Sequence, residues 1–351
     1  MRSCTKRIRI NIRNYDSEVY LLLYKPRIIR GFFVFFKHTL RRAFDRLISK
    51  IVALYSNKTV MSKEIEEVIK NHEREGKYFD INGINTFALD KGSGEVVFCV
   101  HGVPTSSFLY RKVIDSLVEK GRRGVSVDLP GLGLTDRPED FDYEFNNFAD
   151  FLTDCLKELN IEKFHLVVHD IGGPVGFALA AKNLEKVQSI TILNTMIDIQ
   201  NFKKPLVMRP FEKKVLGEAE LISITHATWP VMFSQMGVNN SSCSTSAEIK
   251  AYVDLLKRED DGKAFLKLMR NFNQTEEFQN LVQTALKNVD YPIQAVWGED
   301  DPALTYEHFS KELKELTDTQ ETHLLSSRHF LQEEVHEEIA AKIDDLIKRT
   351  Y

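Results

Sequence analysis

Beyond residue 77 the sequence alternates short β-branched runs with amphipathic segments, and this alternation limits the fold more than any other feature. Several of these runs end at Gly, Pro or Asp, which is typical of strands buried on both faces of a parallel sheet. The candidate strands are Tyr78–Ile81, Thr86–Leu89, Val96–Val100, Arg123–Asp128, Phe164–His169, Ser189–Asn194, Ile293–Trp297 and Glu321–Leu325. Between two of them, Asn146–Leu159 places its apolar residues on one helical stripe. The alternation predicts an α/β protein built on a doubly wound, mostly parallel sheet.

This alternation stops after Asn194 and resumes at Ile293. The residues between them read as helical, with apolar positions three and four residues apart in Leu255–Arg270 and Glu276–Leu286. Ligands of open α/β sheets bind beyond the carboxyl ends of the strands, so an insertion at this point would form a lid over the site. The expected division is a core of residues 77–197 and 291–351 with an inserted helical cap of residues 198–290.

The first sixty residues differ in charge from the rest. They contain 14 Lys and Arg against 3 Asp and Glu, a net charge of +11, which leaves 33 against 48, a net charge of −15, for residues 61–351. Basic residues interrupt their apolar runs, so they contain no uncharged stretch of about 18 residues that would span a bilayer. Three interpretations stay open for residues 1–60: an extension without function upstream of a true start at Met61, an organelle-targeting leader, and an amphipathic segment in weak contact with a membrane surface through residues 20–55.

Charge and cysteine content narrow the function of the remaining chain. Its acidic balance argues against a nucleic-acid partner, because neutralising phosphates needs a basic surface. The four cysteines lie far apart and form no C-x-x-C pair, so neither a disulfide framework nor a cysteine zinc site is indicated. We expect a protein of a reducing compartment, cytoplasmic unless the leader directs it elsewhere. We expect it to take a small-molecule substrate and to need no metal or organic cofactor; its oligomeric state stays open.

One strand end carries a candidate nucleophile. Strand Phe164–His169 runs into Asp170, Ile171 and two glycines, after which a helix is expected. A residue on a tight strand-to-helix turn with small neighbours has the geometry of a nucleophile elbow, here with Asp170 at its apex. The alternative is that Asp170 only caps the helix, since Asp is a preferred N-cap residue.

Three other loops complete a catalytic set. The loop after the third candidate strand contains Val103, whose backbone N–H could join that of Ile171 in an oxyanion hole. The loop after the seventh candidate strand contains Asp301, and a later loop contains His329. Nucleophile, acid and base then follow along the chain as Asp170, Asp301 and His329, each beyond the end of a predicted strand.

Five short motifs occur in a fixed order between residues 77 and 351. They are His101–Ser107, Asp128–Gly133, His169–Gly173, Trp297–Pro302 and His329–Glu333. Together they resemble the α/β-hydrolase superfamily, in its haloalkane dehalogenase and epoxide hydrolase branch. The resemblance implies an eight-stranded, mostly parallel sheet with a helical cap, and Asp170 as the nucleophile. It also selects Asp301 over Asp300, because the acid of this branch is usually the third residue after the Gly of Trp-Gly.

An aspartate nucleophile implies a particular reaction. A carboxylate displaces a leaving group at a saturated carbon and leaves an alkyl ester on the enzyme. Water then hydrolyses this ester, with His329 as general base and Asp301 orienting its ring. The resemblance thus predicts a haloalkane dehalogenase-like hydrolase of a small or medium apolar substrate. The alternatives are an epoxide hydrolase, a cofactor-free oxygenase similar to a luciferase on this scaffold, and a non-catalytic ligand receptor.

The chain departs from both kinds of relative where the leaving group would bind. Similar haloalkane dehalogenases carry Trp after the nucleophile and often Asn after His-Gly, whereas this chain has Ile171 and Val103. Epoxide hydrolases of the branch use two cap tyrosines, and the expected cap holds only Tyr252. Trp229 is the one candidate for a replacement donor, and Phe233 and Tyr252 are candidates for the pocket wall. The alternative is that Trp229 and Phe233 only pack the cap on the core.

Two further groups are interpreted as structural. His165 and His169 share a strand face, but histidines on a buried strand usually pack or form hydrogen bonds, so a metal site is disfavoured. The last group is expected to form a solvated acidic face and consists of Glu333, Glu334, Glu337 and Glu338.

Overall fold

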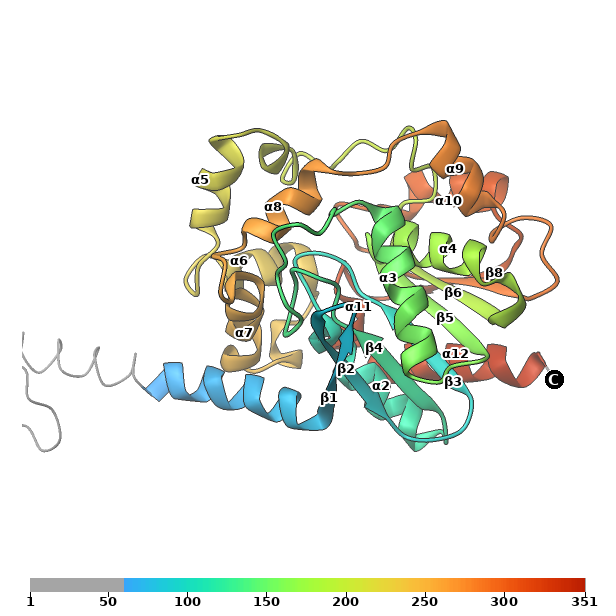
Figure 1. Ribbon diagram of the computed structural model, residues 1–351, viewed down its shortest axis with the longest axis horizontal. Coiled ribbons are helices and arrows are strands. Elements are labelled where there is room, and N and C mark those ends of the chain that lie inside the picture. Colours follow the sequence, from blue (N-terminus) through green and yellow to red (C-terminus); the bar gives the residue numbers. More distant parts are fainter. Residues whose placement is uncertain (1–59, 351) are drawn as a thin grey trace, which may run out of the picture. The chain divides into compact units, whose positions relative to one another are not determined.

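An eight-stranded sheet with helices on both faces organises residues 60–350, which are the residues that the computed structural model describes (Figure 1). The interpretations offered for residues 1–59 lie outside this range. The strands are β1 (Gly76–Ile81), β2 (Ile84–Lys91), β3 (Val96–Val100), β4 (Arg123–Val127), β5 (Phe164–Asp170), β6 (Val187–Thr195), β7 (Ile293–Gly298) and β8 (Thr319–Leu325). All eight predicted strands are confirmed, with ends shifted by no more than two residues.

The sheet has the order β1-β2-β4-β3-β5-β6-β7-β8. Strand β2 runs antiparallel to β1 and β4, and every other pair is parallel. The central strands β3, β5 and β7 are almost wholly buried because helices cover both faces, which explains their unbroken apolar sequences. Helices α2 (Arg111–Glu119) and α12 (His336–Arg349) pack together on one face, and α3 (Phe145–Glu158), α4 (Gly172–Lys182) and α9 (Glu276–Gln283) pack together on the other.

The remaining helices and helical turns are shorter. They are η1 (Ser107–Tyr110), η2 (Leu184–Lys186), η3 (Arg209–Glu212), α5 (Leu216–Ser223), α6 (Trp229–Met232), η4 (Phe233–Gly237), η5 (Ser241–Cys243), α7 (Ser246–Lys257), α8 (Lys263–Arg270), α10 (Tyr306–Leu316) and α11 (Leu331–Glu334). A helix also runs through residues 60–75, ahead of the first strand, and buries Ile65 and His72. Within residues 60–350, no helix combines the length and hydropathy that crossing a bilayer requires.

The segment between β6 and β7 is mainly helical, as expected. The helical spacing of Leu255–Arg270 is shared by two helices, because α7 ends at Lys257 and α8 begins at Lys263. Glu259, Asp261 and Gly262 all have positive φ, which an α-helix does not allow, and the Asp260 carboxylate accepts the first N–H groups of α8. Helix α9 packs on α4 of the core, and the expected cap boundaries of 198–290 stay a prediction.

The topology gathers the loops that carry the candidate residues. Strands β3, β5, β6 and β7 are parallel neighbours, so their carboxyl ends meet at one edge of the sheet. The loops that follow them hold Val103, Asp170, Asn194 and Asp301. The loop after β8 brings His329 to the same edge, beneath helices of the β6–β7 segment. Binding at this edge is the general rule for open α/β sheets.

Candidate active site

Asp170 stands at the apex of a sharp turn between β5 and α4. Its φ is +53°, a left-handed conformation that only Gly, Asn and Asp adopt with ease, and the turn directs the side chain out beyond the sheet. Small neighbours are required because a Cβ at Gly172 would lie 2.2 Å from the carbonyl oxygen of Val100, and one at Gly102 would lie 2.3 Å from the Asp170 carboxylate. The Thr195 hydroxyl donates to the Asp170 carbonyl and supports the turn from β6.

The carboxylate of Asp170 meets different partners at its two oxygens. Oδ1 accepts a hydrogen bond of 2.7 Å from the backbone N–H of Val103. Oδ2 lies 3.6 Å from Nε2 of His329. Ile171 lies at the N-terminus of α4, where the helix dipole favours negative charge. The two residues predicted for an oxyanion hole thus flank the carboxylate itself, which is the group where charge would develop if an ester of Asp170 were attacked.

His329 is oriented by a buried aspartate. Its Nδ1 lies 2.8 Å from Oδ2 of Asp301, whose other oxygen accepts the N–H groups of Ala303 and Leu304 at 2.8 and 3.0 Å. Asp301 is only 2% exposed. Asp300 is exposed and accepts a hydrogen bond from the Asn239 amide instead. Of the two adjacent aspartates, the structure therefore brings Asp301 to the imidazole.

Asn194 holds Asp301 in place. Its amide nitrogen donates to Oδ2 of Asp301 at 2.8 Å, and its amide oxygen accepts the N–H of Gly298 at 2.8 Å. The sequence analysis identified Asn194 only as the end of a predicted strand. The structure shows that Asn194 binds Asp301. With this contact, both oxygens of the Asp301 carboxylate have hydrogen-bond partners.

Asp170, Asp301 and His329 change one another's pKa values. Burial favours neutral groups, but the His329 imidazolium and the N–H donors outweigh it, so the pKa of Asp170 and that of Asp301 lie below their usual range. Burial also disfavours the imidazolium, yet the charges of Asp301 and Asp170 outweigh it and raise the pKa of His329. All three shifts favour two ionised carboxylates with a protonated histidine between them.

The loop that carries His329 is fixed by backbone contacts with the π-helical turn η4. The N–H of His329 donates to the Met236 carbonyl at 3.3 Å, and the N–H of Phe330 donates to the Gly237 carbonyl at 2.7 Å. From below, Nε2 of His169 donates to the His329 carbonyl at 2.8 Å. His169 is thus a support of the loop, and His165 binds Ser189 at 2.8 Å. Within residues 60–350, no three His, Cys, Asp or Glu side chains converge as a metal site would need.

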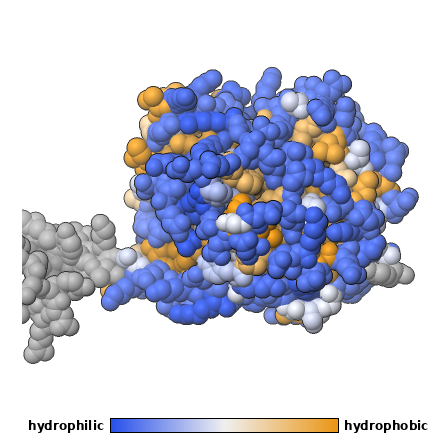
Figure 2. Space-filling view, viewed as in Figure 1, coloured by the Kyte–Doolittle hydropathy of each residue, from blue (hydrophilic) through white to orange (hydrophobic). Residues whose placement is uncertain are grey.

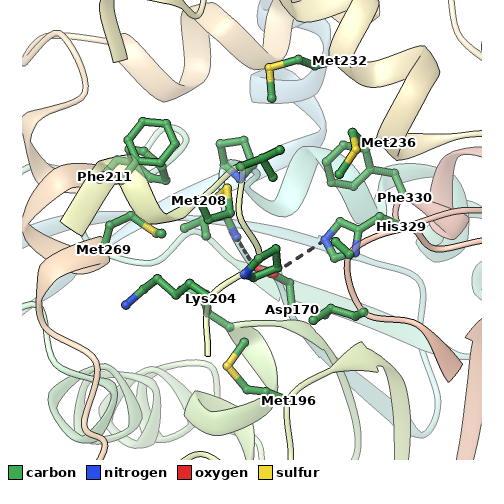
Figure 3. A pocket seen from close by; sticks show the side chains of 18 of the residues that line it. Asp170, Met196, Lys204, Met208, Phe211, Met232, Met236, Met269, His329 and Phe330 are labelled. Carbon is green, nitrogen blue, oxygen red and sulfur yellow. Dashed lines mark hydrogen bonds and ion pairs between the residues drawn. The ribbon is translucent and has the colours of Figure 1, made fainter. Parts of the chain in front are cut away.

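An apolar cavity lies above Asp170 and His329 (Figure 3). Methionines and aromatic residues from η3, α6, η4 and α8 form most of its wall, and methionine adapts readily to ligands of different shape. The principal apolar residues are Met196, Phe202, Met208, Phe211, Trp229, Met232, Met236, Phe265, Met269, Phe272 and Phe330. Val103 and Ile171 line its floor beside Asp170. Such a wall suits a hydrophobic substrate.

Two polar groups other than Asp170 and His329 reach this wall. Nε1 of Trp229 is buried and has no hydrogen-bond partner within the described residues, so this N–H is free to bind a ligand. Lys204, which the sequence analysis missed, lines the cavity while its ammonium binds Glu212 at 3.0 Å and lies 3.7 Å above the Phe272 ring. Lys204 follows another lysine in an irregular loop, so no periodic signal could have pointed to it.

Phe233 and Tyr252 do not line the cavity, contrary to expectation. Phe233 packs behind Phe330 with ring centroids 5.8 Å apart, and Tyr252 stacks on the same ring at 6.2 Å. The Tyr252 hydroxyl donates to Glu333, which points it away from Asp170. Tyr252 is therefore a packing residue of the cap rather than an acid above the nucleophile.

Glu333 is the centre of a buried charge cluster, so its assignment to a solvated face is wrong. Glu333 lies in α11 and is 1% exposed. Arg111, at the start of α2, binds it with both terminal nitrogens, and the Lys112 ammonium lies 2.8 Å away. The Ser244 hydroxyl donates at 2.8 Å, so the cluster joins the cap to the core. Despite burial, these cations hold the pKa of Glu333 at about 2.

We expect the variant Tyr252→Phe to lose stability and keep its catalytic rate. The change removes one donor from buried Glu333, which costs about 1–3 kcal/mol of unfolding free energy. Urea unfolding and initial rates measure the two effects. Tyr291→Phe is the matched control, because it removes one tyrosine hydrogen bond, to the Ala285 carbonyl, far from the cavity. A rate loss of about 10²–10⁴ in Tyr252→Phe alone would instead identify a general acid.

Comparison with known proteins decides the family. A family model described as the alpha/beta hydrolase fold matches residues 95–335, more than half of the chain. The chain belongs to the α/β-hydrolase family. This assignment confirms the resemblance drawn from the five motifs, and the eight-stranded sheet of this α/β hydrolase confirms the predicted fold class.

Named relatives of this α/β hydrolase catalyse different reactions. It is 39% identical over 117 residues to cis-3-alkyl-4-alkyloxetan-2-one decarboxylase of Shewanella oneidensis, covering 32% of this chain and 36% of that one. It is 31% identical over 121 residues to haloalkane dehalogenase 2 of Mycobacterium bovis, covering 34% and 42%. These matches thus span about two-fifths of the relatives' length or less. An epoxide hydrolase structure from Vigna radiata superposes with a TM-score of 0.66 at 22% identity, covering 78% of this chain and 98% of that one, and shares its fold.

Proposed function

We propose that this α/β hydrolase forms a covalent alkyl ester on Asp170 and hydrolyses it through His329. The observation that carries the proposal is the 2.7 Å hydrogen bond from the Val103 N–H to the nucleophile's own Oδ1. In an enzyme with a serine nucleophile, the oxyanion forms on the substrate. Here the donor already faces the oxygen that would become the oxyanion when water attacks the Asp170 ester.

In the first step, one oxygen of the ionised Asp170 carboxylate attacks a saturated carbon of the substrate. A new carbon–oxygen bond forms, and the leaving group departs with the electron pair of the broken bond. The lowered pKa of Asp170 keeps the carboxylate ionised at neutral pH. The apolar wall removes bulk water from the carboxylate, so the nucleophile meets the electrophile rather than solvent.

In the second step, His329 acts as the general base. Ester formation neutralises Asp170, which removes one of the two anions that raise the pKa of His329 and so favours its neutral form. The neutral Nε2 takes a proton from water, the hydroxide attacks the Asp170 ester carbon, and Asp301 stabilises the resulting imidazolium. The alcohol leaves, the carboxylate is restored, and the net reaction is substitution of the leaving group by hydroxyl.

The cavity favours a leaving group that departs as a stable anion. Apart from Asp170 and His329, the lining includes two side chains that can donate hydrogen bonds: Trp229, whose buried N–H has no partner within the described residues, and Lys204, whose ammonium is paired with Glu212. A departing halide needs such donors. This supports a haloalkane dehalogenase-like reaction in which Trp229 replaces the donors absent at Ile171 and Val103.

A strained lactone is the second candidate. Attack of Asp170 at the alkyl carbon opens the ring and releases a carboxylate, which is also a stable anion and suits the same two donors. The bond to this carboxylate can then break: its electron pair forms a carbon–carbon double bond, the Asp170 carboxylate is expelled, and an alkene and carbon dioxide leave without the use of water. One curated relative is named for the decarboxylation of an alkyl-substituted oxetan-2-one. An epoxide is less well served, because its oxygen leaves as an alkoxide that needs a proton, and the hydroxyl of Tyr252 points to Glu333.

A substrate panel separates these reactions. Purified protein is incubated with bromo- and iodoalkanes, with a dialkyl oxetan-2-one and with an alkyl epoxide, and halide, carbon dioxide and diol are measured. We expect halide release, with carbon dioxide release as the outcome for the second candidate. Diol formation without either of the other products would contradict both candidates and favour an epoxide hydrolase.

Trp229→Phe tests the leaving-group donor. This change keeps an aromatic wall but removes the N–H, and a hydrogen bond to a departing anion is worth about 1.5–3 kcal/mol, so the rate of ester formation should fall about 10- to 100-fold. The loss should be larger for chloride than for iodide, because the better leaving group needs less stabilisation. Phe211→Leu, a wall change without a donor, should lack this dependence on the halide.

A further inference from the structure

The exposed apolar side chains of the protein are concentrated on the cap. Six of the ten large hydrophobic residues that stand exposed within residues 60–350 lie between residues 206 and 231. We name these six the apolar rim: Leu206, Val207, Val215, Leu216, Ile222 and Val231. Leu206, Val215 and Ile222 are each more than 70% exposed. Figure 2 shows hydrophobic surface gathered at the upper left, the region of α5 in Figure 1.

The same segment carries positive charge on an acidic protein. Lys203, Arg209, Lys213 and Lys214 are all exposed, and none of the four forms an ion pair with a carboxylate of the described chain. The ion-paired lysine of this segment is Lys204. Residues 203–231 hold five Lys and Arg against Glu212, Glu218 and Glu220, a net charge of +2, whereas residues 61–351 have a net charge of −15, so the segment locally reverses the overall charge. Exposed aliphatic residues interleaved with unpaired lysines are typical of surfaces that enter the lipid–water interface.

The apolar rim continues into the cavity. Val207 is 46% exposed and also lines the cavity above Asp170, as does neighbouring Pro205. A hydrophobic molecule at the rim would therefore find apolar side chains along its whole way inward. Hydrophobic compounds dissolve in lipid far better than in water. If the rim lay on a bilayer, the mouth of the cavity would face the lipid in which such substrates are concentrated.

We propose that the apolar rim docks on the surface of an anionic phospholipid bilayer, with its aliphatic side chains in the acyl boundary and its four cations at the phosphates. A protein partner fits less well, since protein interfaces are enriched in aromatic residues and poor in lysine, and the rim has no aromatic residue. A second copy of this chain would bring the unpaired cations of both rims together. The docking does not rest on the reaction proposed for Asp170.

Quenching by brominated lipids tests the contact at the rim itself. Leu216→Trp, in the full-length chain, places a fluorophore on the rim, and vesicles of phosphatidylcholine and phosphatidylserine carry bromine on their acyl chains. We expect its added emission to shift to the blue and to be quenched. Leu184→Trp is the matched control: Leu184 is 41% exposed on η2, before β6 and so at the opposite edge of the sheet from the cap, and it should stay unquenched.

This local readout separates the rim from the basic N-terminal residues, which could bind vesicles by themselves. Vesicle binding without quenching of Leu216→Trp would overturn the proposal, as would equal quenching of both variants or a lack of binding. Concentration-dependent dimerisation that shields Leu216→Trp in the absence of lipid would overturn it in favour of a second copy of the chain.

The cations give an independent test. Lys213→Gln with Lys214→Gln removes two charges from the rim, and partitioning onto the anionic vesicles should weaken about tenfold or more. Lys311→Gln with Lys314→Gln, on exposed positions of α10, removes the same charge elsewhere and should have little effect. Equal losses for both pairs would show attraction by overall charge alone and would overturn a specific docking surface.

Discussion

Replacement of Asp170 by Asn is expected to abolish turnover, by roughly 10⁴-fold or more, because the change removes the only charge that can attack the substrate. The fold should persist, since Asn tolerates the left-handed conformation that Asp170 adopts and keeps its shape. Thermal unfolding checks the fold and product formation checks the rate. Asp170→Ala serves as a second variant, because an Asn that slowly hydrolysed to Asp would regain activity and Ala would not.

Isotope labelling tests the covalent role separately from the need for a charge. In a single turnover in heavy-oxygen water, label should enter the Asp170 carboxylate, because water attacks the ester carbon contributed by the protein. Mass spectrometry of the peptide that contains Asp170 measures this uptake. Label found only in the alcohol after one turnover would mean that water attacks the substrate directly, which would refute an ester on Asp170.

His329→Ala is expected to stop the reaction after its first step. Ester formation needs only the carboxylate, whereas hydrolysis needs a base, so the hydrolysis rate should fall by about 10²–10⁴ while the protein accumulates an alkyl adduct. Intact-protein mass spectrometry would report the mass of the alkyl group. His308→Ala, which alters a histidine with a 72% exposed side chain on α10, should form product without an adduct. Loss of product from His329→Ala with no adduct on the protein would contradict the two-step mechanism.

The two steps should depend on pH in different ways, because ester formation needs Asp170 and hydrolysis needs His329. Asp170 has a lowered pKa, so ester formation should hold constant on acidification until the pH falls through that value. Hydrolysis needs neutral His329, whose pKa is raised, so its rate should increase as the pH rises through the pKa of the ester form. Acid should therefore cause the ester to accumulate in the unmodified protein. Rapid quenching at several pH values, followed by mass analysis, measures its amount.

The core strands and the loops that carry Asp170, Asp301 and His329 were predictable from sequence because their signals are local. Several buried strands are short apolar runs with a Gly or Asp at the end, and a turn such as that at Asp170 restricts the residues around it. The break between α7 and α8 was missed for the opposite reason. Apolar spacing continues across it, while the interruption depends on backbone conformations at Glu259 and Asp261 that periodicity does not reveal.

The contents of the site were harder to predict because they depend on contacts between distant parts of the chain. Glu333 looks like one of several solvated glutamates, and only the fold brings Arg111 and Tyr252 to it from 222 and 81 residues away. That contact also removed Tyr252 from the cavity. Asn194 had a recognisable position but no signal that it would bind Asp301. Trp229 was predicted to donate toward the nucleophile, and its unpartnered N–H keeps this prediction in place.

If the reaction runs as proposed, the hydrogen bonds between the His329 loop and η4 would connect product release to hydrolysis. A cap that swings away must separate the carbonyl groups of Met236 and Gly237 from the loop that presents the base. With the cap open, the His329 imidazole would be displaced from its position beside Asp170. Water entering the cavity would then not be activated to attack the ester. Cap opening and proton transfer would depend on the same two hydrogen bonds. A variant whose cap opens more easily would therefore release product faster and hydrolyse the ester more slowly.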